Sequence, residues 1–218
     1  MIVVIAGATG LTGRSLIEAL SQDQRISTIR ALVRKPGTLP PTTKLEEVVL
    51  SNEDFLHLSE SSDPRLSGEL YLCALGTTIR KAGSKSEFRK VDFTAVTEFS
   101  KLCEKRGGKS LGVVSAIGSN KHAPNFYSRV KGEAEQAILA LDIARVVIAR
   151  PALLIGDRSE RRLAERAGIK LFRALSPVLP TKIRSFLGTP VESLARRLLE
   201  STLQGLPGKI ILEASELS

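Results

Sequence analysis

Several residue types are scarce in this sequence, and their scarcity excludes several kinds of protein. The chain has no tryptophan, and aromatic residues make up only 4% of its 218 residues. Because it also lacks any nucleic-acid-binding motif, we expect no nucleic-acid partner. Cys73 and Cys103 are too few for a disulfide framework, and we expect them to be buried thiols. His57 and His122 share no metal-ligand spacing with other residues, so we expect no metal site.

Long apolar runs are absent as well. No run reaches the length of a membrane-spanning helix, so we expect no transmembrane segment. Met1 leads directly into a short apolar run that a glycine turn ends, which predicts a chain without a signal peptide and a cytoplasmic location. Lys and Arg number 32 against 23 Asp and Glu. This excess favours anionic partners such as a phosphate-rich cofactor, although a solvated basic surface would also explain it.

The start of the chain carries the motif around which the rest is organised. Residues 2–6 form an apolar run typical of a buried strand, glycines follow at Gly7, Gly10 and Gly13, and residues 14–20 have helical periodicity. A strand, a glycine turn and a helix can cradle a dinucleotide pyrophosphate, because glycine permits close approach and helix N–H groups attract phosphate. We therefore predict a dinucleotide site here rather than a purely structural turn.

Strands and helices alternate along the rest of the chain. We predict further strands at residues 27–33, 45–50, 69–75 and 110–115, within 143–155, and at 209–212. We predict helices near residues 55–58 (capped by Ser51 or Asn52) and at 84–106, 125–141, 159–175 and 192–203. Short apolar strands joined by helices indicate a parallel sheet covered on both faces.

The predicted fold class is therefore α/β, a doubly wound, Rossmann-like parallel sheet in a three-layer α/β/α arrangement. We expect one NAD(P)-binding domain over residues 1–218. Only 62 residues follow Gly156, too few for a separate substrate domain. We expect roughly residues 157–205 to form a small cap over the sheet edge.

The end of the second predicted strand indicates which dinucleotide binds. In a dinucleotide-binding sheet this position contacts the adenosine ribose, where an acidic residue accepts from the 2′-hydroxyl of NAD. Here Arg34 and Lys35 follow the strand instead. Because guanidinium grips phosphate, we expect NADP(H) to be favoured over NAD(H), with a solvated basic loop as the alternative.

A tyrosine and a lysine four residues apart carry the predicted chemistry. Tyr127 and Lys131 lie on one face of the predicted helix, so the ammonium, together with the positive charge of oxidised nicotinamide, could stabilise the phenolate and lower the pKa of Tyr127. Tyr127 could then exchange a proton with a carbonyl or alcohol during hydride transfer. Ser115, at the end of the fifth predicted strand, could hold the same oxygen, and Ser119 is a second candidate for that role.

These motifs together resemble the short-chain dehydrogenase/reductase superfamily, within it the compact atypical group that includes the HIV Tat-interacting protein and its bacterial relatives. The resembling segments are residues 5–13, 74–78, 114–119, 125–133 and 150–158. The resemblance implies that Ser115, Tyr127 and Lys131 are catalytic. The cofactor-binding residues expected from motif and resemblance together are Gly7, Thr9, Gly10, Leu11, Thr12, Gly13, Arg34, Lys35, Ala74, Leu75, Gly76, Thr77, Ser115, Tyr127, Lys131, Pro151, Ala152 and Leu153.

One residue departs from the family pattern. Asp92 stands where many relatives have an asparagine that supports a proton relay through water and the lysine. Asp92 could accept a hydrogen bond in its place, but a relay does not follow from the resemblance alone.

Three functions remain open from the sequence. The first is an NADP(H)-dependent oxidoreductase acting on a small carbonyl or alcohol. The second is a catalytically weak NADP(H)-binding module that regulates or docks on a partner protein or an anionic membrane surface through the basic helix 159–175. The third is a nucleotide-sugar epimerase or dehydratase, which is disfavoured because such relatives have a larger C-terminal region. The sequence leaves monomer and homodimer open.

Overall fold

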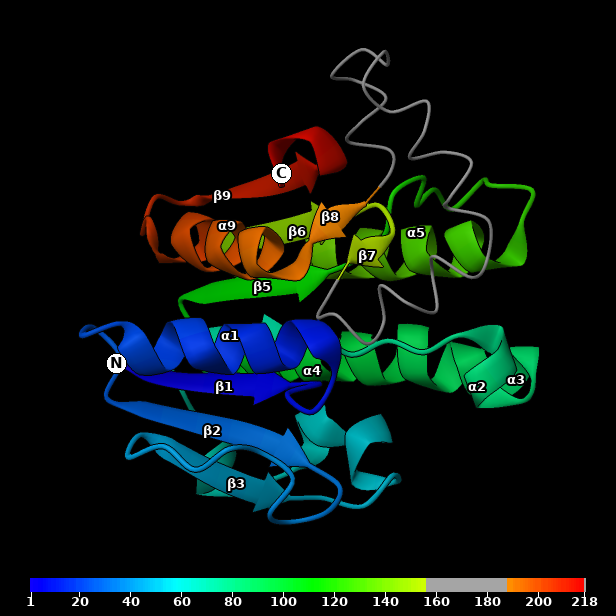
Figure 1. Cartoon of the computed structure of the whole chain (residues 1–218). Coiled ribbons are helices and arrows are strands. Elements are labelled where there is room, and N and C mark those ends of the chain that lie inside the picture. Colours follow the sequence, from blue (N-terminus) through cyan, green and yellow to red (C-terminus); the bar gives the residue numbers. More distant parts are fainter. Residues whose placement is uncertain (156–187, 218) are drawn as a thin grey trace.

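The computed structural model describes residues 1–155 and 188–217 and contains a seven-stranded parallel sheet (Figure 1). The strand order is β3-β2-β1-β4-β5-β6-β9. The strands are β1 (Ile2–Ala6), β2 (Thr28–Val33), β3 (Leu45–Val49), β4 (Leu70–Cys73), β5 (Ser110–Val114), β6 (Arg145–Arg150) and β9 (Gly208–Glu213). Each neighbouring pair is parallel. The predicted Rossmann-like fold is confirmed.

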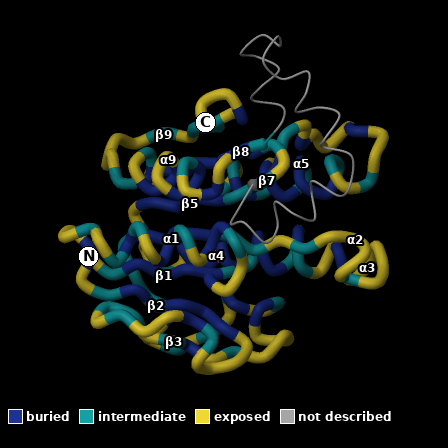
Figure 2. The backbone as a smooth tube through the Cα atoms, in the orientation of Figure 1, coloured by how far each residue is buried: buried dark blue, intermediate teal, exposed yellow. Residues whose placement is uncertain are grey.

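Helices cover both faces of the sheet. In Figure 1, α1 (Leu11–Gln22) and α9 (Val191–Leu203) lie on one face, and α4 (Val96–Lys105) and α5 (Phe126–Leu139) lie on the other. The burial map shows the central strands as the buried layer between them, whereas the edge strands β3 and β9 are largely intermediate or exposed (Figure 2). Alternate residues of a strand point to opposite faces, so Val3 packs with Leu16 of α1 while Val4 packs with Phe99 of α4. A strand in a sheet that is covered on both faces therefore needs consecutive apolar residues.

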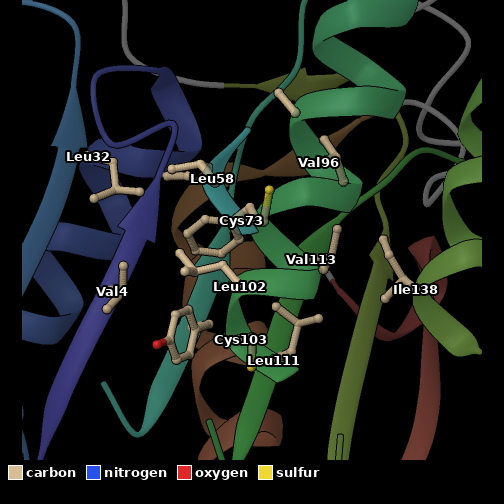
Figure 3. Close-up of a cluster of buried hydrophobic side chains, with 14 of the residues drawn as sticks. Val4, Leu32, Leu58, Cys73, Val96, Leu102, Cys103, Leu111, Val113 and Ile138 are labelled. Atoms are coloured by element: carbon tan, nitrogen blue, oxygen red, sulfur yellow. The ribbon is translucent and has the colours of Figure 1, made fainter. Parts of the chain in front are cut away.

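The two predicted core thiols lie on β4 (Cys73) and on α4 (Cys103), in the same hydrophobic cluster. Cys73 and Cys103 are both fully buried and free. Figure 3 shows them among Val96, Leu102 and Val113. Burial raises the pKa of each thiol to about 12, so both are neutral packing groups at neutral pH.

The predicted helix over residues 84–106 is present but not uniform. It consists of α3 (Lys85–Arg89), a wide π-helical stretch over Lys90–Ala95, and α4, and it ends before Gly107, which has a positive φ. A shorter helix, α2 (Ile79–Ala82), precedes it. Apolar periodicity does not reveal the π-helical stretch, because periodicity assumes a uniform 3.6-residue turn and the wider π turn shifts which residues face the core. This stretch carries Asp92 into the interior.

The brief helix predicted near residues 55–58 is replaced by three short 3₁₀ segments, Asp54–Leu56, Leu58–Glu60 and Pro64–Leu66. The predicted cap by Ser51 or Asn52 is not observed, because the N-cap of the first 3₁₀ segment is Glu53, without a side-chain cap. Ser51 instead stabilises the preceding turn: its hydroxyl accepts from the N–H of Asp54, and its own N–H donates to the Asp54 carboxylate.

The C-terminal elements complete the sandwich. We expected residues roughly 157–205 to form a cap over the sheet edge, but α9 packs on α1 and on strands β5 and β6, within one of the two helical layers. After it, β9 becomes the last strand of the sheet. The short strands β7 (Leu154–Ile155) and β8 (Thr189–Pro190) pair with each other in a separate two-stranded sheet. The rest of the predicted cap, including the basic helix 159–175, lies outside the described residues.

Candidate functional site

The opening glycine turn is a close contact between three pieces of backbone. A Cβ at Gly7 would lie 2.4 Å from the carbonyl carbon and oxygen of Ala74, and the φ of Gly7 is +82°. A Cβ at Gly13 would lie 2.1 Å from the carbonyl oxygen of Gly7. Gly7 and Gly13 are therefore required for α1 and the 74–78 turn to approach β1.

Gly10 is different, because a Cβ there would make no contact shorter than an ordinary van der Waals contact. The nearest atom to a Cβ there is the Gly7 carbonyl oxygen at 3.4 Å. Gly10 is also the N-cap of α1, it offers no side-chain cap, and the first turn of the helix contains no acidic residue. The N–H groups of this first turn, which Leu11, Thr12 and Gly13 contribute, have no intrahelical acceptor. The turn thus fits an anionic phosphate group, as the sequence motif predicts.

A third cation lies beside the turn and was missed in the sequence. Arg14 donates from Nε to the carbonyl oxygen of Thr9 and from its guanidinium to that of Thr38, both at 3.2 Å. It therefore joins the glycine turn to the loop after β2. Arg34 and Lys35 begin that loop and are exposed. The position of Arg14 directly after Gly13 could have identified it in the sequence. It was missed because helical periodicity predicts a solvent-facing side chain there.

A buried ion pair occupies the centre of the site. The Nζ of Lys131 lies 2.7 Å from Oδ1 of Asp92, and the two side chains are 7% and 0% exposed. The other carboxylate oxygen, Oδ2, accepts from the backbone N–H of Thr77 at 2.9 Å. Burial lowers the pKa of Lys131, but the negative charge of Asp92 and the neighbouring Tyr127 raise it by more. Lys131 is therefore held as a cation.

Tyr127 lies at the exposed side of this pair. It is in the first turn of α5, which Asn125 caps by accepting from the N–H of Ser128 at 2.8 Å. Its ring packs on that of Phe88 with 5.6 Å between centroids, and 37% of the residue is exposed. Burial raises its pKa above the usual value, Lys131 lowers it, and Asp92 raises it, with a net increase. Lys131 thus acts on the phenol in the predicted direction, but partial desolvation and Asp92 outweigh it in the protein alone.

Ser115 is engaged with a different group from the one we expected. Its hydroxyl donates to Oε1 of Glu135 at 2.5 Å and lies 3.0 Å from the hydroxyl of Ser119, the second candidate. Glu135 also accepts from the guanidinium of Arg150 at 2.6 Å. Glu135 lies one turn beyond Lys131 on α5, a spacing that could have identified it in the sequence. The single hydroxyl proton of Ser115 is therefore used within the protein.

The segment after β6 lies next to Ser115. The N–H of Ile117 donates to the carbonyl oxygen of Pro151 at 2.9 Å, and the N–H of Ala152 donates to the buried hydroxyl of Thr189 at 3.1 Å. Leu153 is 60% exposed. Strands β1, β4, β5 and β6 are parallel, so their carboxyl ends lie at the same edge of the sheet. Ligand sites of parallel sheets lie at this edge.

The opposite edge holds a cavity of about 280 Å³, bordered by Glu69, Arg145 and Thr202. Buried Arg145 fills part of this edge and donates to the carbonyl oxygens of Ser201 and Leu206. The cavity is remote from Tyr127 and takes no part in the arrangement above. Among the described residues, no helix is long and apolar enough to cross a membrane.

The comparisons with known proteins begin with relatives of similar sequence. No family model matches the chain. The mitochondrial protein FMP52 of Candida albicans is 35% identical over 162 residues, covering 73% of this chain and 70% of the relative. Rat HTATIP2 is 30% identical over 213 residues, covering 96% and 84%. Several fungal relatives carry the word mitochondrial in their names, which contradicts the cytoplasmic location that we predicted from the sequence.

Solved structures share the fold at low sequence identity. MoeE5 in complex with UDP-glucose and NAD is 19% identical with a TM-score of 0.71, covering 98% of this chain and 75% of that one. A short-chain dehydrogenase family protein from Francisella tularensis is 15% identical with a TM-score of 0.68, covering 99% and 98%. The Bordetella bronchiseptica enzyme WbmG in complex with NAD is 16% identical with a TM-score of 0.69, covering 99% and 73%.

Proposed function

This chain belongs to the atypical short-chain dehydrogenase/reductase superfamily, and we propose that it is an NADP(H)-dependent oxidoreductase acting on a small carbonyl or alcohol. The observation that carries the proposal is the placement of Tyr127 beside buried Lys131 at the sheet edge where the glycine turn also lies. A phosphate cradle and a proton-exchanging phenol at one edge are the two parts that a hydride-transfer site requires.

The protein would hold the cofactor along this edge. The first turn of α1 would bind the pyrophosphate, and Arg34 and Lys35 would face the 2′-phosphate that distinguishes NADP from NAD. Exposed Arg14, which bridges the same two loops, adds a third positive charge to this region. The expected cofactor-lining residues after the strands are Ala74, Leu75, Gly76, Thr77, Pro151, Ala152 and Leu153. Nicotinamide supplies the hydride acceptor or donor when it is bound.

The protein's own residues would transfer the proton to or from the substrate oxygen. Tyr127 would donate its hydroxyl proton to a carbonyl oxygen or accept one from an alcohol. Lys131 would hold the ribose and act electrostatically on the phenol. Ser115 belongs to this proposed set by family resemblance, and its hydroxyl would reach a substrate oxygen only by exchanging its bond to Glu135.

Two measurements test the proposal. Thermal shift with NADPH and NADH tests the cofactor: at a hundredfold excess over the dissociation constant, a bound ligand adds about 2.7 kcal/mol of stability. We expect the larger shift with NADPH, and a larger shift with NADH would refute the role of Arg34. Turnover of NADPH with a panel of small carbonyls tests the reaction. We expect Tyr127→Phe to abolish it; unchanged turnover would refute the mechanism, and tight NADPH binding without turnover would favour a binding module.

A further inference from the structure

Asp92 faces two donors with its two oxygens. Oδ2 accepts from the backbone N–H of Thr77 at 2.9 Å, and Oδ1 faces the ammonium of Lys131 at 2.7 Å. Within the described part of the chain, Oδ1 accepts no other hydrogen bond. The carboxylate is fully buried, so water does not screen its attraction to Lys131.

An asparagine in the same position would satisfy only one of these donors. Its single oxygen could take the Thr77 N–H, but its amide group would then point hydrogen atoms at the Lys131 ammonium. The donor on Thr77 belongs to the backbone and is not removed by any side-chain change. The aspartate is therefore the residue that fits the geometry present here, and it brings a negative charge that asparagine lacks.

The charges that act on the Tyr127 phenol come from two elements. Lys131 on α5 contributes a positive charge, and Asp92 on the π-helical stretch contributes a negative one. Cys73 on β4 also faces Lys131, but burial raises its pKa to about 12, so it carries no charge at neutral pH. The pair of side chains beneath Tyr127 thus has no net charge.

We propose that Asp92 is a positioning residue whose carboxylate, 2.7 Å from the Nζ of Lys131, offsets the effect of the Lys131 charge on the Tyr127 hydroxyl, so that this hydroxyl keeps its proton to a higher pH than Lys131 alone would allow and favours proton donation in carbonyl reduction. This inference rests on the proposed function for its meaning in the reaction. Partial burial of the phenol is the largest cause of the raised pKa of Tyr127, and the negative charge of Asp92 acts in the same direction.

The protonation state of Tyr127 determines whether the site favours carbonyl reduction or alcohol oxidation at a given pH. In reduction, the carbonyl carbon gains a hydride from reduced nicotinamide, the C=O π bond breaks, and the oxygen takes the Tyr127 proton. The remaining phenolate is reprotonated from solvent. Alcohol oxidation requires the phenolate before the hydride leaves. The raised pKa of Tyr127, caused by burial and by Asp92, would therefore favour the protonated phenol that reduction uses over the phenolate that oxidation uses.

The sequence allows the phenol to be titrated directly. The chain has two tyrosines and no tryptophan, so tyrosinate absorbance near 295 nm is free of an indole background. Tyr71 is fully buried, donates to the carbonyl oxygen of Leu66, and has a pKa raised to about 12. Tyr127→Phe isolates the Tyr71 signal, and the difference from the wild type gives the titration of Tyr127.

Asp92→Asn is the decisive variant. Without the carboxylate, the uncancelled Lys131 charge should lower the pKa of Tyr127 by about one pH unit or more. An unchanged or higher pKa overturns the inference. Circular dichroism and the thermal melt establish that the variant is folded before the titration is interpreted.

A double variant keeps the test decisive if Asp92→Asn alone does not fold. Asp92→Asn with Lys131→Met leaves no unpaired buried charge, and we expect Tyr127 to titrate as in the wild type because two opposing charges were removed together. A pKa about one unit higher would show that Asp92 had not cancelled Lys131, and the inference would be wrong. These titrations contain no cofactor and no substrate, so their failure is distinguishable from a failure of NADPH turnover.

Discussion

Gly13→Ala tests whether the opening turn is a close backbone contact. The added Cβ would lie 2.1 Å from the carbonyl oxygen of Gly7 and 2.6 Å from the Cα of Ala8. Both are backbone atoms, so no side-chain rotation relieves the overlap, and α1 would have to move away from β1. Overpacking of this kind destabilises by about 1–3 kcal/mol, which lowers the Tm of a protein of this size by about 2–12 °C.

Gly10→Ala is the matched control in the same turn. Its Cβ would meet only the Gly7 carbonyl oxygen, at 3.4 Å, and its φ of −76° suits alanine. We expect its Tm to stay within about 2 °C of the wild type. Alanine is a poorer N-cap than glycine, which destabilises the helix, but it also lowers the entropy of the unfolded chain, which stabilises the protein. Differential scanning fluorimetry without ligand measures both variants. If Gly13→Ala melts with the wild type, or Gly10→Ala melts as early as Gly13→Ala, the steric argument is wrong.

Three further outcomes follow from individual contacts. Glu135→Gln should lower the unfolding free energy by about 3 kcal/mol in urea denaturation, because it leaves the guanidinium of Arg150 without its buried partner, whereas exposed Glu213→Gln should change it by less than about 1 kcal/mol. Burial raises the pKa of Glu98, but its hydrogen bonds lower it further. Its stabilisation is therefore present above the ordinary value of 4.5 and lost as the pH falls below it, so the stability difference from Glu98→Gln should shrink on acidification. Arg34→Ala should weaken NADPH binding at least tenfold in calorimetric titration and leave NADH binding nearly unchanged; an equal loss for both would contradict a 2′-phosphate role.

The sheet was predictable because of how its strands are buried. The predicted strands 27–33 and 110–115 each contain consecutive residues without polar side chains, 31–33 and 111–114, and a strand covered on both faces requires that pattern. The observed strands β2 and β5 lie within one or two residues of these ranges. The helix that carries Tyr127 was predictable too, because Asn125 is a typical N-cap and is the N-cap observed.

The electrostatics of the site could not be predicted in the same way. Lys131 and Tyr127 share a helix, so their proximity follows from a spacing of four. Asp92 is on another element, and its contact with Lys131 depends on the π-helical stretch and on how that stretch packs against α5. The raised pKa of Tyr127 depends on partial burial and on the negative charge of Asp92. Neither is encoded in the spacing of residues along one helix.

The role of Ser115 illustrates the same limit. Its place at the end of a strand was correctly predicted, since it directly follows β5. The partner of its hydroxyl was not, because Glu135 is 20 positions away and Arg150 a further 15. A strand-end hydroxyl can face either the substrate or the interior, and only the packed structure decides.

The most direct test of the central claim follows a labelled hydride. The protein is incubated with NADPH carrying deuterium at both C4 positions of the nicotinamide and with the carbonyl panel, and the products are examined by mass spectrometry. The account predicts an alcohol with one deuterium on the former carbonyl carbon and none with Tyr127→Phe. Alcohol without deuterium, or equal deuterium transfer by the Tyr127→Phe protein, would contradict it.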